Sequence, residues 1–143
     1  MTSLTVPESA YTETKGMRYF ARMLSKIRFF AQGTLREDFH DNLGKGADGW
    51  CCSHLGIDYD QLKVRVLEGG SNSNEEILDW CYAHGRALSD KDIFIWNNFV
   101  SKLGWNDSIS DTLKRRKAES GLSDRNDIQT MSEYFEYDEG RKH

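Results

Sequence analysis

An arginine among apolar residues is the feature of this sequence with the clearest chemical consequence. One side of a predicted helix carries residues spaced three or four apart: Met17, Phe20, Ala21, Leu24, Ile27 and Ala31. Arg28 falls within this apolar stripe, and an enclosed guanidinium needs a carboxylate, backbone carbonyls or a bound anion beside it. Arg28 is therefore a candidate ligand-binding residue. The structural alternative is an ion pair with a carboxylate near the C-terminus: Asp127, Asp138 or Glu139.

A second polar residue interrupts an apolar stripe further along the chain. Asn97 lies between Ile93, Trp96 and Val100, which share one side of a predicted helix. Its amide either bonds a neighbouring helix end within the core or lines a polar pocket. We therefore treat Asn97 as a second candidate ligand-binding residue.

The segment Asp38-Phe39-His40-Asp41 is the one local cluster that combines carboxylates with a histidine. A nearby carboxylate favours the charged imidazole, and a histidine so placed can transfer protons. Asp38 and His40 are therefore candidate acid–base or ligand-binding residues, with a solvated loop as the alternative. A metal site would need a second pair of ligands at a typical spacing, which the sequence lacks, so we expect no metal and no cofactor.

The balance of charge argues against a nucleic-acid partner. The formal net charge is −4, and the only basic run is Lys114–Lys117. Four consecutive residues point in most directions around a helix, so this run cannot form one flat phosphate-binding stripe. A stripe does follow the first predicted helix, and we expect acidic residues of other segments to cover it: Lys15, Arg18, Arg22 and Lys26.

Cysteine usage and hydropathy favour the cytoplasm. Cys51, Cys52 and Cys81 are odd in number and include no Cys-x-x-Cys pair, so neither a disulfide framework nor a zinc site is predicted. No apolar run approaches the roughly 20 residues of a membrane span. The first residues lack the charged and apolar regions of a signal peptide, so we expect reduced thiols in a cytoplasmic protein with no membrane partner.

The elements that must position these residues are predicted to be helices. Glycine stops and Ser, Asp or capping-box starts delimit them at roughly these ranges: 17–32, 50–55, 59–68, 74–81, 90–103, 108–120 and 125–137. Residues 34–49 are predicted to be a loop with a short extended piece near 35–39. The fold class is therefore all-α, a compact single domain of six or seven short helices around an aromatic-rich core. Residues 1–14 are expected to be a flexible N-terminal arm, and residues 15–143 the single helical domain.

Several strings, in this order, resemble a known family: Met23–Arg28, Gly33–Leu35, Leu55–Asp58, Asn74–Trp80, Trp96-Asn97, Arg125–Thr130 and Asp138–Arg141. The family consists of small bacterial proteins and is known only as the domain of unknown function numbered five thousand and sixty-nine. The resemblance covers nearly the whole chain after about residue 14, and it implies a single domain without an assigned activity. The chain departs from the family pattern in its glycine-rich segment 41–50 and at Cys51-Cys52.

Two hypotheses about function follow from these residues. The first is a helical binding or interaction module, with Arg28 and Asn97 as polar anchors for a small anionic ligand or a protein partner. The alternative is a small enzyme in which Arg28 holds an anionic substrate while Asp38 and His40 supply acid or base. Neither the residues nor the resemblance assigns a reaction.

Overall fold

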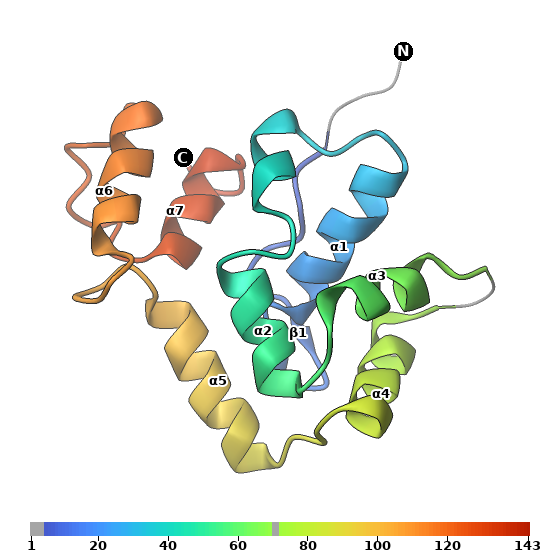
Figure 1. The fold of residues 1–143 in the computed structure, drawn as a ribbon. Coiled ribbons are helices and arrows are strands. Elements are labelled where there is room, and N and C mark those ends of the chain that lie inside the picture. Colours follow the sequence, from blue (N-terminus) through green and yellow to red (C-terminus); the bar gives the residue numbers. More distant parts are fainter. Residues whose placement is uncertain (1–4, 70–71) are drawn as a thin grey trace.

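Helices make up most of the fold, which a computed structural model describes for residues 5–69 and 72–143. The α-helices are α1 (Phe20–Ala31), α2 (Ala47–Leu55), α3 (Tyr59–Leu67), α4 (Asn74–His84), α5 (Asp90–Lys102), α6 (Ser110–Glu119) and α7 (Met131–Asp138). A 3₁₀ helix, η1 (Glu37–Asn42), precedes α2. The strands β1 (Glu13–Thr14) and β2 (Met17–Arg18) pair antiparallel. The predicted all-α fold class is confirmed, with this small hairpin as an addition (Figure 1).

The helix starts that the sequence predicted are confirmed by side-chain caps. The Asp58 carboxylate accepts a hydrogen bond from the Gln61 backbone N–H, and Ser73 Oγ accepts one from the Glu76 N–H. Ser89 and Asp92 form a complete capping box at the start of α5. These caps satisfy backbone donors that the first helical turn leaves without partners. They therefore fix where α3, α4 and α5 begin.

Four segments differ from the prediction, one of them residues 47–49, which were predicted to be loop and form the first turn of α2. Residues 17–18 form β2 rather than the first turn of a helix, because Lys15 and Gly16 at φ 50° and 83° make a tight turn that returns the chain. Residues 37–42 form η1, where the sequence suggested a loop with an extended piece. The last helix begins at Met131 rather than 125, because Thr130 caps it by accepting from the Glu133 N–H.

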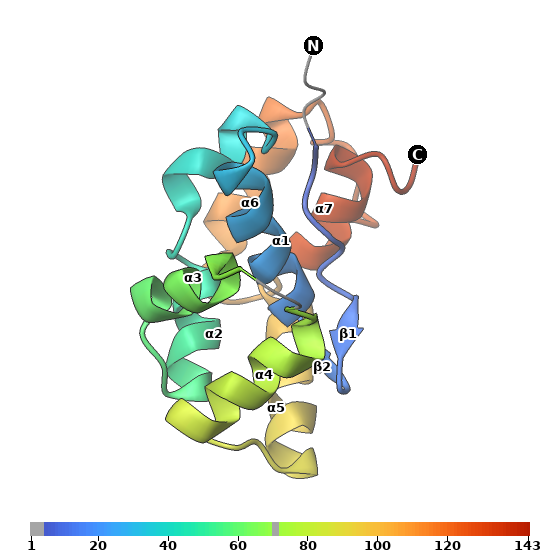
Figure 2. The same ribbon diagram turned by 90° about the vertical axis from the view of Figure 1, so that its right-hand side faces the viewer.

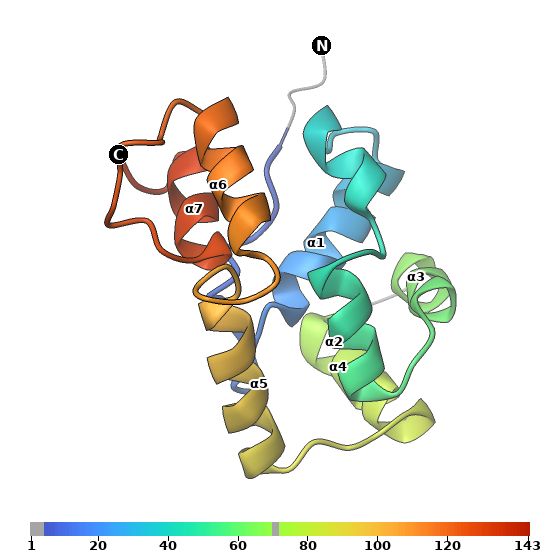
Figure 3. The ribbon, with the colours of Figure 1, turned by 60° about the vertical axis from the view of Figure 1, so that its left-hand side comes forward.

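The N-terminal segment runs along the helices. The Thr5 N–H donates to the Thr34 carbonyl at 2.7 Å, and the Glu8 N–H donates to Ser25 Oγ at 2.9 Å. Ala10 is only 2% exposed. Figure 3 shows this segment passing between α1 and α7. Residues 1–4 of the predicted arm lie outside the described residues.

The helices form two groups that meet at α1 and the hairpin. In the first group α1 contacts α3, and α3 contacts α2 and α4. In the second, α5 contacts β2 and α7, and α6 contacts α7 (Figures 1 and 2). The main core lies around α1 and is made of buried residues such as Phe20, Leu24, Leu55, Leu62, Ile77 and Trp96. A smaller cluster of Leu113, Ile128 and Tyr134 joins α6 to α7.

None of the helices in the described ranges is both long enough and apolar enough to cross a bilayer.

Candidate functional site

A pocket of about 190 Å³ opens where the two groups of helices meet. Residues of α1, η1, the start of α2, the end of α5, α6 and α7 line it. Its apolar walls include Phe39, Trp50, Val100, Leu103, Met131 and Phe135. Its charged lining residues, as far as the structure describes the chain, are all cationic: Arg22, Lys26, Lys45 and Arg116. The pocket therefore combines apolar walls with positive charge.

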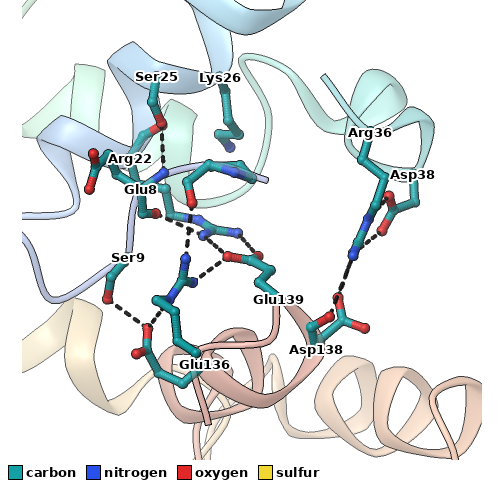
Figure 4. Close-up of polar contacts among 12 residues, drawn as sticks. Glu8, Ser9, Arg22, Ser25, Lys26, Arg36, Asp38, Glu136, Asp138 and Glu139 are labelled. Carbon is teal, nitrogen blue, oxygen red and sulfur yellow. Dashed lines mark hydrogen bonds and ion pairs between the residues drawn. The ribbon is translucent and has the colours of Figure 1, made fainter. Parts of the chain in front are cut away.

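Arg22 is the arginine that the described part of the chain encloses most completely. Its residue exposure is 1%, and it forms a bidentate ion pair with Glu139 at 2.9 and 2.7 Å (Figure 4). It also donates to the Glu8 carbonyl at 3.1 Å, and it lies 3.9 Å from the centre of the Phe135 ring. Its Nε, however, is buried and has no acceptor among the described residues. The terminal nitrogens of Arg22 are thus bound within the protein, whereas its Nε–H has no acceptor in the described part of the chain.

The C-terminal end of the chain holds this ion pair in place. Arg141 bonds Glu139, and it also donates to Glu136 at 2.9 Å and to the Pro7 carbonyl at 3.0 Å. Ser9 Oγ donates to Glu136 at 2.6 Å, which links the N-terminal segment to α7. The network visible in Figure 4 therefore ties the N-terminal segment and the C-terminal end of the chain to α1. It fixes the position of the wall that carries Arg22.

Lys26 forms a second buried ion pair one turn further along α1. Its Nζ lies 2.7 Å from Asp48 Oδ1, and it donates to the Tyr19 hydroxyl at 3.2 Å. The Tyr19 hydroxyl in turn donates to Asp48 at 2.7 Å, and Asp48 also accepts from the Gly44 N–H. Lys26 is 6% exposed and Asp48 is fully buried. The ammonium has three N–H bonds, and two have acceptors among the described residues.

Burial changes the acid–base properties of this group of side chains. Burial lowers the pKa of Lys26, because it disfavours the charged ammonium, although the charge of Asp48 opposes the change. Burial and the charge of Asp48 raise the pKa of the Tyr19 hydroxyl well above its ordinary value. A lysine with a lowered pKa in a pocket is typical of functional sites, although structural ion pairs also shift pKa values.

Two cations at the pocket have no carboxylate partner. Lys45 and Arg116 take part in none of the ion pairs among residues 5–69 and 72–143. Lys45 is exposed and Arg116 is half-buried. The Nε of Arg116 is buried without an acceptor in the described part of the chain. Because Glu139 and Asp48 balance Arg22 and Lys26, the positive charge that remains at the pocket comes from Lys45 and Arg116.

The start of α2 adds to the positive potential of the pocket. Lys45, Gly46 and Ala47 line the pocket, and Ala47 is the first residue of α2. Gly46 provides no side-chain cap. Because a helix N-terminus carries partial positive charge and free N–H groups, it favours an anion at this end of the pocket. Asp48 offsets part of this effect.

Arg28 lies outside the pocket. It is half-buried rather than enclosed, because the last turn of α1 extends beyond the core and Phe30 and Ala31 are exposed. Its guanidinium donates to Asn74 Oδ1 at 2.6 Å and to the Asn72 carbonyl at 3.0 Å, at the start of α4. Burial lowers its pKa. The prediction that Arg28 is the enclosed arginine of α1 is therefore wrong. The enclosed arginine is Arg22, and its partner is Glu139.

Asn97 also lies outside the pocket and bonds the hairpin. Its Oδ1 accepts from the Arg18 N–H at 2.9 Å, and its Nδ2 donates to the Gly16 carbonyl at 2.8 Å. Trp96 Nε1 donates to the Arg18 carbonyl nearby. These bonds attach the hairpin to α5, whereas the structural alternative expected a bond to a neighbouring helix end. Its role as a ligand-binding residue stays a prediction.

Of the segment 38–41, Phe39 lies at the pocket. Phe39 lines the pocket, whereas Asp38 and His40 are exposed. Asp38 pairs with Arg36 at 2.6 Å, and His40 Nε2 lies 2.9 Å from the Leu35 carbonyl. The structure brings Asp38 and His40 onto η1 but does not place either beside Arg28 or Asn97. Ligand binding or acid–base chemistry at Asp38 and His40 stays a prediction.

The sequence did carry signals for the cations that line the pocket. Arg22 and Lys26 belong to the basic stripe that was expected to be covered by acidic residues, and Glu139 and Asp48 do cover them. Arg116 belongs to the basic run, in which one member had to point inward because the run circles α6. Nothing in the sequence indicated that Lys45 would line a pocket, apart from its place in a glycine-rich loop.

The pocket offers little to a metal ion or to thiol chemistry. Within the described residues no three His, Cys, Asp or Glu side chains gather as a metal site would require. Burial raises the pKa of Cys52 and of Cys81 to about 12, so both stay protonated at neutral pH. The chemistry available to the pocket is therefore that of its cations and of the Lys26–Asp48–Tyr19 group.

The fold and the pocket together define a small helical domain with a cation-lined cavity. Over residues 4–141 the chain matches the family described as Domain of unknown function (DUF5069). The chain belongs to this family, as the resemblance indicated. Comparison with curated proteins gives no match. A function must therefore be inferred from the pocket itself.

Proposed function

We propose that this domain binds a small organic anion that carries an apolar body. The observation that supports the proposal is a pocket with apolar walls and four cationic lining residues, in which the described part of the chain contributes no acidic lining residue. An anionic group would lie near Lys45 and Arg116, whose charges have no carboxylate partner among the residues that the structure describes. The apolar body would contact walls such as Phe135 and Trp50.

Unsatisfied donors support an anion rather than a neutral ligand. The Nε atoms of Arg22 and Arg116 are buried without acceptors among the described residues, and both side chains line the pocket. Buried donors are almost always hydrogen-bonded, and an unpaired one costs about 1–3 kcal/mol. A carboxylate or phosphate oxygen would satisfy such donors, and arginine suits both groups.

The size of the pocket limits the ligand. An apolar cavity of about 150 Å³ holds one benzene molecule. The pocket here has about 190 Å³, which admits one ring, or a short chain, together with a carboxylate. A single-ring aromatic acid is therefore a suitable probe.

We further infer that the domain acts in the cytoplasm. Cys51, Cys52 and Cys81 are buried and free. Free thiols persist in reducing compartments, whereas secreted domains of this size commonly pair their cysteines.

Isothermal titration calorimetry with 4-methylbenzoate tests the proposed ligand class. We expect saturable binding at one site per chain, and no binding of 4-methylbenzylammonium, which has a similar shape and the opposite charge. Arg116→Ala and Lys45→Ala should each weaken binding about tenfold or more, since a hydrogen bond to a charged group contributes about 1.5–3 kcal/mol.

Arg115→Ala is the matched control for these variants. Arg115 is the neighbour of Arg116 on α6, but it is exposed and pairs with Glu119. The substitution Arg115→Ala removes one positive charge, as Arg116→Ala does, but it leaves the pocket lining unchanged. The affinity of this variant for 4-methylbenzoate should therefore equal that of the wild type. Equal losses in Arg115→Ala and Arg116→Ala, or equal affinity for the cationic probe, would contradict the proposed function.

A further inference from the structure

We infer that Lys26 is a carbonyl-reactive amine that forms an imine with a small carboxylic acid bearing an aldehyde or ketone. The inference rests on the proposed function, because the same pocket must first bind the acid. It goes further by assigning a covalent step to one side chain. The geometry of Lys26, Asp48 and Tyr19 carries it.

The three side chains form a closed triangle at the wall of the pocket. Lys26 Nζ and the Tyr19 hydroxyl both lie 2.7 Å from Asp48 Oδ1, and they lie 3.2 Å from each other. Tyr19 and Lys26 line the pocket, whereas Asp48 is fully buried behind them. An amine is thus held at the cavity with a proton acceptor on its far side.

The free donor of Lys26 is consistent with a ligand at this position. Two of its three N–H bonds have acceptors among the described residues, and a ligand carbonyl oxygen would provide the third. Burial lowers its pKa, so a larger fraction of the amine is neutral at a given pH than for an exposed lysine. Lys45 lines the same pocket but is exposed, which makes it an internal comparison.

The covalent step balances within the group of side chains and the ligand. The Lys26 ammonium passes one proton to Asp48, and the neutral nitrogen forms a bond to the carbonyl carbon while the C=O π bond breaks. A second nitrogen proton moves to the former carbonyl oxygen. This oxygen then leaves as water with the proton from Asp48, and a protonated C=N bond to Lys26 remains. Tyr19 donates to Asp48 and so positions the carboxylate.

Reductive trapping with 4-formylbenzoate tests the inference on the full chain. The protein is incubated with this aldehyde and sodium cyanoborohydride at neutral pH, and the reduced adduct is located by peptide mass spectrometry. We expect the adduct on Lys26 before any other lysine, and slower labelling when 4-methylbenzoate competes. Benzaldehyde lacks the carboxylate, so labelling with benzaldehyde should show no preference for Lys26 over other lysines.

Variants separate the reactive amine from a merely structural one. Lys91→Met, at an exposed lysine outside the pocket, should keep the adduct on Lys26, and Lys26→Arg should abolish it while retaining a cation beside Asp48. Asp48→Asn should slow labelling of Lys26 without moving the adduct elsewhere. The wild-type peptide map stands even if a variant fails to fold. An adduct on Lys45 or spread over surface lysines would overturn the inference.

Direct binding measurements distinguish failure of this inference from failure of the proposed function. If 4-methylbenzoate binds and 4-formylbenzoate binds equally but leaves Lys26 unlabelled, the reactive amine is refuted and the binding function stands. If neither compound binds, both are refuted.

Discussion

Two arginines on α1 show how differently one helix can use the same side chain. Arg22 is 1% exposed and forms a bidentate pair with Glu139 at the wall of the pocket. Arg28, six positions further along, is half-buried and bonds the start of α4 through Asn74 and Asn72. Both have defined partners, but of the two only Arg22 lines the pocket. Burial alone does not identify a site; position relative to a cavity does.

The comparison extends to the regions around the two arginines. Around Arg22, carboxylates lie behind the cations, so that the cavity itself is lined by positive charge. Around Arg28 and His40, the polar groups bond one another or the backbone at the surface. The first region resembles a binding site because carboxylates contact its cations from the protein interior, whereas only cations face the cavity among the charged residues described.

Removing the enclosed guanidinium should give the largest loss of stability. Arg22→Met leaves Glu139 buried with Arg141 as its remaining partner, and breaking a buried ion pair in this way costs about 3–5 kcal/mol. Urea unfolding followed by circular dichroism measures the change. The double variant Arg22→Met/Glu139→Leu should recover part of it, because no buried carboxylate is then left unpaired. A loss of unfolding free energy no greater than that caused by Arg28→Met would contradict the distinction drawn between the two arginines.

Arg28→Met should have an intermediate effect. It removes two hydrogen bonds from a half-buried charged group, and such bonds contribute about 1.5–3 kcal/mol each when fully enclosed, so a total of about 1–2 kcal/mol is expected here. The same urea titration measures it. The affinity for 4-methylbenzoate should not change. A selective loss of binding at unchanged stability would instead make Arg28 a ligand contact.

Asp38→Asn should have the smallest effect. Burial raises the pKa of Asp38, but the hydrogen bonds and the charge of Arg36 outweigh it and lower the pKa below 3.8. The pair is largely exposed, so its contribution at neutral pH is about 0.2–1 kcal/mol.

The pH dependence of this small effect has a defined sign. Because the folded-state pKa is lowered, the contribution is present above 3.8 and is lost as the pH falls through the folded value. The stability difference between the wild type and Asp38→Asn should therefore narrow as the pH falls below 3.8. A difference that grows in acid would contradict the ion pair with Arg36.

The local features of the fold could be predicted from the sequence. The caps Asp58, Ser73 and Ser89 act within three residues of their partners, and the apolar spacing of α1 is equally local. The start of α7 was harder to predict, because the polar segment before Thr130 also has a helix-compatible pattern.

The candidate site could be predicted only in part, because its partners lie far apart in the chain. Arg22 and Glu139 are separated by 117 positions, and Lys26 is paired with a residue of a different helix. The sequence named Glu139 as a partner for an arginine of α1, but Arg28 fitted the apolar stripe better than Arg22. Only the packing of α7 and the N-terminal segment against α1 decides between them.

Backbone amide NMR during a titration with 4-methylbenzoate tests the anion pocket most directly. We predict saturable chemical-shift changes centred on Gly46, Ala47 and Arg116, with little change at Arg28 or His40. Shift changes centred on Arg28 and His40, or no saturable change at all, would contradict the assignment of the pocket as the binding site.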